Sequence, residues 1–468
     1  MFTLFGKPYR RCGGITRRHF LTAGALGLGG LTLADVLRAE AAAGKGTSGK
    51  AIVNIHLDGG PPHLDMIDLK PDAPSEIRGE FKSIATKVPG LRIGELMPKV
   101  AGIADKFAFI RSLVGSAGAH DAFQCQSGFP ASDLRSLGGR PALGSVVAKL
   151  RGSADDIAPP FVDLMQGRPF VRNSARPGFL GPTCNPFRPD ISKMFARELE
   201  AGMKKELAAR GEDHAIQFTL VDGLTAERLN DRTRLRAAFD AARRDLDGGG
   251  MEAMDRFTQQ AVSILTSGRF AAAMDLSKEP ASVLERYTPP AAPTADRFYT
   301  SEDGTAARKL LLARRLIEAG VRCVSVSFSD FDTHADNFGR MRQLLPIVDH
   351  ALHALVTDLD ERGLLGDVAI VVWGEFGRTP KINKKAGRDH WPEVSLALLA
   401  GGGLKGGQVI GATDRQGGRV VSRPVRFQEV FATLYHTLEI DPSATVLTDP
   451  NGRPQHLLER GEPIRELV

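Results

Sequence analysis

Three short apolar segments have the composition of buried β-strands. They are residues 51–57, 321–328 and 368–373, and each is rich in aliphatic residues and ends abruptly in a polar, glycine-containing or acidic stretch. Helical patterns at 306–319 and 344–361 precede the second and third segments, as expected for parallel strands. The sequence therefore predicts an α/β fold with parallel strands.

Between the first and second strands lies a long region with a helical pattern. Residues 192–209, 226–246 and 251–276 are rich in Ala, Leu, Arg and Glu, with apolar residues at helical spacing. A triple glycine at 248–250 separates two of these helices, and a proline-rich linker follows at 289–293. We predict one large α/β domain over residues 45–468, with a helical insert at about 190–290.

The N-terminus has the pattern of a twin-arginine signal peptide. Arg17 and Arg18 precede an aromatic and an aliphatic residue, an apolar Gly- and Ala-rich run covers 22–33, and small residues at 39–43 offer cleavage sites. The run is shorter than the ~20 residues that span a bilayer. We predict a signal over residues 1–44, recognised by the twin-arginine translocation machinery, and a periplasmic or extracellular protein. The alternative is a helix that packs on the domain, and an uncleaved signal would keep the protein at the membrane.

Removal of this segment changes the charge of the protein. The full chain of 468 residues carries a formal charge of +6, but the segment contains six basic residues and only two acidic ones (Lys7, Arg10, Arg11, Arg17, Arg18 and Arg38 against Asp35 and Glu40). The mature protein is near neutral and has no run of five basic residues, which argues against nucleic acid as a partner.

The cysteines do not form a recognisable framework. Cys12 would leave with the signal, and the other three are widely spaced (Cys125, Cys184 and Cys323). One disulfide with one free thiol is compatible with this spacing. Cys323 lies in an apolar segment and is expected to be buried in a strand.

Candidate metal ligands follow each predicted strand. Asp58 follows the first, Asp332 and His334 the second, and Glu375 the third, with His390 further along the same loop. Because ligands bind beyond the carboxyl ends of parallel strands, these loops are expected to converge. Imidazole with carboxylate suits Zn²⁺, whereas carboxylates alone would favour Ca²⁺ or Mg²⁺. Taken singly, such residues are also common in turns and helix caps.

Three further residues are candidates for catalysis. Arg378 could bind a phosphate or sulfate through two parallel hydrogen bonds. His63 stands in the loop after Asp58, and His120, beside Asp121, is a weaker candidate in a fourth loop. A glycine-rich run at 401–407 lacks both nucleotide-binding patterns and is better explained as a connection between strands.

Several motifs together resemble a large bacterial family of exported proteins of unknown function. This family is often labelled sulfatase-like and is placed in the alkaline-phosphatase-like superfamily. The matching stretches cover nearly the whole mature chain and are RRHFL, LDGGPPHLDMIDLKPDAPSEIRGEF, PGFLGP, FDTHADNFGRM, WGEFGRTPKIN, GRDHW and AGGGLKGGQVIGATD.

The resemblance implies a three-layer α/β/α sandwich with a mainly parallel central sheet and a divalent metal site. It implies Asp332, His334 and His390 as ligands of one ion, and Asp58 and Glu375 as ligands of another. The superfamily's nucleophile is missing, because the loop after Asp58 holds no Ser, Thr or Cys. Water activated by a metal ion is then the expected nucleophile, with Arg378 or His63 stabilising the developing charge.

Two functions are compatible with these patterns. The first is an exported metal-dependent hydrolase of phosphate or sulfate esters, acting on a small anionic compound or a polysaccharide. The alternative is a non-catalytic exported binding or assembly protein that retains the fold.

Overall fold

The structure is a computed structural model that describes residues 49–135, 138–153, 156–167, 175–195, 268–290 and 302–468. These residues belong to one compact unit, Lys50–Val468, apart from Gly49. The predicted signal at 1–44 and most of the predicted helical insert lie outside the described residues.

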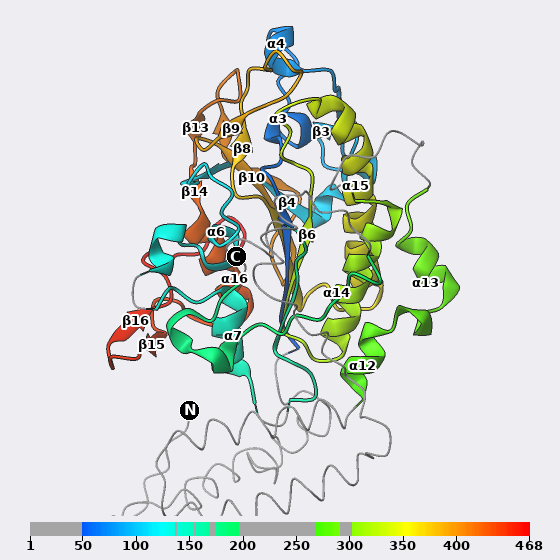
Figure 1. Cartoon of the computed structure of the whole chain (residues 1–468). Helices are drawn as coiled ribbons and strands as arrows, with labels where there is room; N and C mark the ends of the chain where they lie inside the picture. The colour runs from blue at the N-terminus through cyan, green and yellow to red at the C-terminus, as the bar shows by residue number, and fades with distance from the viewer. Residues whose placement is uncertain (1–48, 136–137, 154–155, 168–174, 196–267, 291–301) are drawn as a thin grey trace, which may run out of the picture. The chain divides into compact units, whose positions relative to one another are not determined.

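A mainly parallel sheet forms the centre of this unit (Figure 1). Within the described residues, only β10 runs antiparallel to its neighbours. The strands in spatial order are β11 (Gln408–Ile410), β4 (Phe107–Val114), β10 (Ser395–Gly401), β7 (Val368–Trp373), β1 (Ala51–Leu57), β6 (Cys323–Phe328) and β5 (Phe161–Leu164), with β14 (Val425–Arg426) beside β4. The central strand β1 pairs with β6 on one side and β7 on the other, so the carboxyl ends of all three lie at one edge.

Helices cover both faces of the sheet, which makes a three-layer α/β/α sandwich (Figure 1). One face packs against α14 (Arg308–Glu318) and α15 (Asn337–Glu361). The other packs against α6 (Gln124–Ser127), α7 (Leu143–Arg151) and α16 (Phe427–Thr437). The predicted fold class is confirmed.

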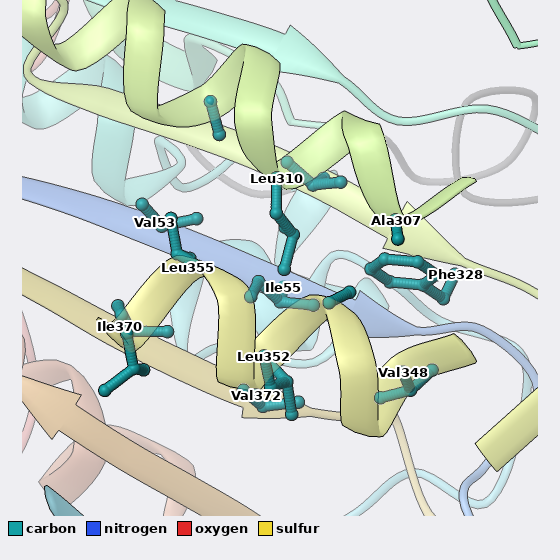
Figure 2. Close-up of a cluster of buried hydrophobic side chains, with 14 of the residues drawn as sticks. Val53, Ile55, Ala307, Leu310, Phe328, Val348, Leu352, Leu355, Ile370 and Val372 are labelled. Carbon is teal, nitrogen blue, oxygen red and sulfur yellow. The ribbon is translucent and has the colours of Figure 1, made fainter. Parts of the chain in front are cut away.

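A hydrophobic core lies on each face of the sheet, and successive apolar side chains of a strand point alternately into one core and the other. Val53 and Ile55 of β1 face α14 and α15, as Figure 2 shows, whereas Ile52 belongs to the core on the opposite face. Leu310 of α14 and Leu352 of α15 close over the same side (Figure 2). A strand buried on both faces reads as a continuous apolar run, which is why 51–57 and 368–373 were recognisable from sequence.

Smaller elements surround the sandwich. The short helices are α3 (His63–Met66), α4 (Ser75–Arg78), α5 (Pro98–Gly102), α12 (Arg269–Met274) and α13 (Ala281–Arg286). The two-stranded sheets pair β2 (Ser83–Ala85) with β3 (Arg92–Gly94), β8 (Gly377–Arg378) with β9 (His390–Trp391), β12 (Ala412–Thr413) with β13 (Val420–Ser422), and β15 (Val446–Thr448) with β16 (Pro454–His456). None of the helices among the described residues has the length and apolar character needed to cross a bilayer.

Several local predictions can be compared with the structure. The predicted bounds 51–57 and 368–373 match β1 and β7. The helix predicted from 344 begins earlier, at Asn337, because Asp336 caps it by accepting a hydrogen bond from the Gly339 N–H. Residues 401–407 connect β10 to β11, as expected. Cys323 is buried in β6, and all three described cysteines are free thiols, so the possible disulfide is absent among them.

Candidate metal centre

Four strands deliver polar side chains to the same edge of the sheet. His56 lies near the end of β1 and Asp58 follows it, while Glu375 follows β7. Asp332 follows β6, and His120 comes from the loop after β4. These four strands are mutually parallel, so their carboxyl ends coincide. His390 joins them from β9, just before β10 begins at this edge.

Three of these residues form the inner ligand group, His56, Asp58 and Glu375. All three are buried, and one ligand atom of each lies within 4.8 Å of the others. His56 Nε2 lies 3.4 Å from Glu375 Oε2, yet neither of these atoms, nor His56 Nδ1, has a hydrogen-bond partner among the described residues. An unpaired buried polar atom is costly. One imidazole with two carboxylates fits a divalent ion, which would satisfy these atoms.

The outer ligand group consists of His120, Asp332 and His390. Their ligand atoms also lie within 4.8 Å of one another, but the side chains are only partly buried. His120 Nε2 lies 3.1 Å from Asp332 Oδ2, and His390 Nε2 lies 3.4 Å from Asp332 Oδ1. Two imidazoles with one carboxylate are a donor set that suits Zn²⁺.

His120 connects the two groups. While its Nε2 faces Asp332, its Nδ1 lies 3.0 Å from Glu375 Oε1 in the inner group. The ring packs edge-on against His390, with centroids 4.6 Å apart, and also contacts the Phe376 ring. The two ligand groups are therefore adjacent parts of one centre.

The protonation states favour ligand chemistry. Burial lowers the pKa of His56, although Glu375 opposes this shift, so the imidazole stays neutral and keeps a lone pair. Burial alone would raise the pKa of Glu375, but the His120 hydrogen bond and the neighbouring imidazoles leave the pKa lowered. Burial also acts against ionisation of Asp332, yet His120, His390 and Arg378 hold its pKa well below the usual range.

Arg378 holds the loops around this centre together. It is fully buried, and its guanidinium donates to the carbonyls of Gly59, Gly60 (3.1 Å) and Arg388 (2.9 Å) and to Asp332 Oδ1 (2.6 Å). Four of its five N–H donors are thus committed to the protein. This arrangement corrects the expected grip on a substrate anion, because a buried and paired guanidinium is not presented to a ligand.

The loop after β1 needs its two glycines. Both have positive φ, 106° at Gly59 and 84° at Gly60. A Cβ at Gly59 would lie 2.4 Å from the Asp332 backbone nitrogen, and one at Gly60 would lie 2.4 Å from the Phe376 ring. The glycines therefore let the β1 loop approach the loops after β6 and β7.

Most of the site residues predicted from sequence lie in the centre. Asp58, Asp332, Glu375, His390 and His120 lie in the two ligand groups. His334 is half-exposed beside them, with Nε2 3.2 Å from Asp332 Oδ1 and Nδ1 2.6 Å from Asp389 Oδ1.

His63, which was expected to stabilise charge and not to bind metal, lies outside both ligand groups. It is completely buried in α3, and its Nε2 lies 2.8 Å from the carbonyl of Gly417. One ring nitrogen of His63 thus faces a backbone carbonyl, and its role in stabilising charge at the centre stays a prediction.

His56 is the ligand candidate that sequence reasoning missed. His56 lies within the apolar segment 51–57, so the sequence pattern indicated a buried strand residue and not a ligand. The available signal was its spacing, because a histidine two residues before Asp58 points to the same side of an extended chain as that carboxylate.

The fold and the centre define a mainly parallel α/β protein with two adjacent histidine–carboxylate ligand groups at the carboxyl edge of its sheet. The chain belongs to the family described as "Protein of unknown function (DUF1501)", whose profile matches residues 49–468. No match was found among curated proteins.

Solved structures give distant similarities. The PsFucS1 sulfatase from Pseudoalteromonas sp. is 11% identical with a TM-score of 0.37, over 87% of this chain and 70% of that one. Alkaline phosphatase from the Antarctic bacterium TAB5 is 12% identical with a TM-score of 0.31, over 84% and 99%. The lipoteichoic acid synthase LtaP from Listeria monocytogenes is 8% identical with a TM-score of 0.33, over 88% of each chain. Such similarity concerns the fold alone.

Proposed function

We propose that this protein is a metal-dependent hydrolase of phosphate or sulfate esters, with an ion in each ligand group. The observation that carries the proposal is the pair of adjacent groups joined by His120. Each supplies three protein ligands, the number typical of catalytic sites that keep a position open. Two neighbouring ions suit the displacement of an ester because they can act on both the attacking and the leaving oxygen.

The residues of the chain prepare the centre for this chemistry. His56 and the carboxylates would hold the inner ion, and His120, Asp332 and His390 the outer one. Bound divalent ions would supply Lewis acidity and lower the pKa of water. The Gly59 N–H holds Glu375 Oε1 at 3.0 Å, and Arg378 holds Asp332, so both carboxylates are oriented.

Water is the nucleophile that the described side chains favour. The loop after Asp58 has no Ser, Thr or Cys, and the hydroxyls of Ser116 and Thr333, which adjoin the ligand loops, are engaged in hydrogen bonds. Ser116 Oγ donates to the Glu375 carbonyl at 2.7 Å, and Thr333 Oγ1 donates to Asn337 Oδ1 at 2.7 Å. The absence of a Ser, Thr or Cys from the loop after Asp58 also favours the second candidate function, a non-catalytic exported binding or assembly protein.

Export by the twin-arginine machinery is part of the proposal. The inner ligand group is buried, so an ion loaded there would be shielded from solvent in the folded protein. A route that carries folded proteins would allow this loading to occur in the cytoplasm. The substrate would then be an anionic ester outside it, in the periplasm or beyond.

The test is metal analysis of protein purified from the periplasm, combined with turnover of aryl phosphate and aryl sulfate. We expect two divalent ions per chain, turnover that is lost on chelation, and recovery when Zn²⁺, Ca²⁺ or Mg²⁺ is returned. Protein that has neither metal nor turnover would refute the hydrolase. Metal-loaded protein without turnover of either ester class would support the binding or assembly role instead.

A further inference from the structure

A buried hydrogen-bond network joins the three loops around the outer ligand group. Its members are Asp65 in α3, Thr333 after β6, Asn337 at the start of α15, and Arg388 in the loop that leads to β9. All four side chains are at most 1% exposed. None of the candidate metal ligands is a member of this network. The network connects segments that are far apart in the sequence.

Arg388 is completely satisfied by this environment. Its Nε and Nη2 donate to the two oxygens of Asp65 at 2.9 and 3.0 Å, in a bidentate pair. Nη2 also donates to the Ile77 carbonyl at 2.9 Å, and Nη1 donates to the carbonyls of Thr379 and Pro380. These are five acceptors for the five N–H donors of a guanidinium. Hydrogen bonds from all three nitrogens of the guanidinium therefore fix the position of the Arg388 side chain.

The same carboxylate reaches the loop after β6. Asn337 Nδ2 donates to Asp65 Oδ2 at 2.8 Å, and Asn337 Oδ1 accepts from Thr333 Oγ1 at 2.7 Å. The chain is closed by a backbone hydrogen bond from Arg388 N to the Thr333 carbonyl, at 2.9 Å. Asp65 therefore sets the relative position of Thr333 and Arg388.

These two residues stand next to ligands of the outer group. Thr333 directly follows Asp332, and Arg388 lies two residues before His390. A shift of either one relative to the other would change the separation of the Asp332 carboxylate and the His390 imidazole, which lie 3.4 Å apart. Metal binding depends on such distances to within a few tenths of an ångström.

Stability alone is a poor explanation for the pair. Replacing a buried ion pair by apolar residues of similar size is often neutral or stabilising, because desolvation offsets the attraction. The two parallel hydrogen bonds of a bidentate Arg–carboxylate pair fix the orientation of one side chain relative to the other. Two metal ligands on separate segments require such a fixed relative position.

We propose that Asp65 and Arg388 are positioning residues, which hold Asp332 and His390 at the separation needed by an ion in the outer ligand group. This inference rests on the proposed metal centre. It assigns no contact with substrate to either residue. Their effect passes through the backbone of Thr333 and Arg388.

The first arm of the test measures metal affinity in the full chain by competitive Zn²⁺ titration. Asp65→Asn should weaken one of the two binding events by about 10–100-fold, the range for residues that orient ligands, and leave the other unchanged. Thr333→Val removes one hydrogen bond of the network and should weaken the same Zn²⁺ binding event by a smaller factor. This variant replaces Asp65→Asn in the test if Asp65→Asn fails to fold. Arg314→Lys is the matched control, because Arg314 is a buried arginine paired with Glu279 and Asp358. It should leave both events unchanged.

The second arm uses hydrogen exchange of the metal-free protein. Asp65→Asn should speed exchange in residues 58–68, 329–337 and 379–392, and Arg314→Lys should not. A folded Asp65→Asn or Thr333→Val variant with wild-type affinity and wild-type exchange would overturn the proposal. Wild-type protein that binds no metal would refute the proposed function instead, and the exchange pattern alone would then decide whether Asp65 orders these loops.

Discussion

The inner and outer ligand groups lie side by side but are built in different ways. The inner group comes from the end of β1 and the first residues after β1 and β7, and its side chains are buried. The outer group comes from the loops after β4 and β6 and from the short strand β9, and its three side chains are between 17% and 27% exposed. The sheet itself positions the inner ligands, whereas the outer ligands depend on hydrogen bonds between loops. The first group should therefore be the more rigid of the two.

The groups also differ in how many of their polar atoms lack a hydrogen-bond partner. Two nitrogens of His56 and one oxygen of Glu375 have no hydrogen-bond partner among the described residues. In the outer group, His390 Nδ1 lies 3.1 Å from the Gly118 carbonyl, and Asp332 contacts Arg378, His120 and His334. An ion would consequently relieve a larger penalty in the inner group. Substitutions can test this difference.

The largest effect is expected for Glu375→Gln. Glu375 is the residue that touches both groups, through His56 on one oxygen and His120 on the other. The variant should lose the inner ion and weaken the outer one, with at least about 100-fold lower metal affinity and a corresponding loss of ester turnover. Metal analysis and turnover of the aryl esters measure both.

The stability of the same variant separates a ligand from a structural residue. The pKa of Glu375 is lowered in the fold, so its carboxylate stabilises the metal-free protein, and Glu375→Gln should lower the thermal unfolding temperature of the metal-free protein no more than a comparable buried Glu→Gln change does. Glu279→Gln is the control, since Glu279 is a buried carboxylate paired with Arg314 and Arg315. Metal content unaffected by Glu375→Gln would contradict the assignment of the inner group.

The comparison also shows how far the sequence could predict the site. The strands after which Asp58 and Glu375 stand were recognisable, because a strand buried on both faces is continuously apolar. His120 was underestimated, since the strand before it, β4, was not identified and its loop could not be assigned to the same edge. The commitment of Arg378 to backbone carbonyls depends on the path of distant loops, which no local pattern encodes.

A smaller effect is expected for His334→Ala. Sequence placed His334 among the ligands, but in the structure it is 50% exposed and pairs with Asp389 while its other nitrogen contacts Asp332. The hydrogen bond with His334 lowers the pKa of Asp389. We therefore expect His334→Ala to retain both ions, with affinity for the outer one reduced by about 10-fold, as for loss of a residue that orients a ligand.

His390→Ala is the matched comparison for this substitution. It removes a member of the outer group and should abolish binding of one ion while the inner ion remains. The two variants are distinguished by titration with Zn²⁺ and a competing chelator. Complete loss of an ion in His334→Ala would return His334 to the ligand set.

The smallest effect concerns the two completely buried histidines, His56 inside the inner group and His63 outside it. Burial is the main cause that lowers the pKa of each below 6.5. The unfolded chain then binds more protons than the folded protein at pH values just below 6.5, so the free energy of unfolding must fall as the pH falls through that window. Each histidine contributes at most about 1.4 kcal/mol per pH unit to this slope.

His63→Gln should remove the contribution of His63 alone, and Gln can still donate a hydrogen bond to the Gly417 carbonyl that His63 faces. Urea unfolding of the metal-free protein between pH 7 and 5 measures the slope, with His436→Gln at an exposed position as the control for the substitution itself. A slope that stays the same in His63→Gln would contradict burial of a neutral His63. A reduced slope together with full metal content would separate this histidine from the inner ligand group, because only His56 would then couple burial to metal binding.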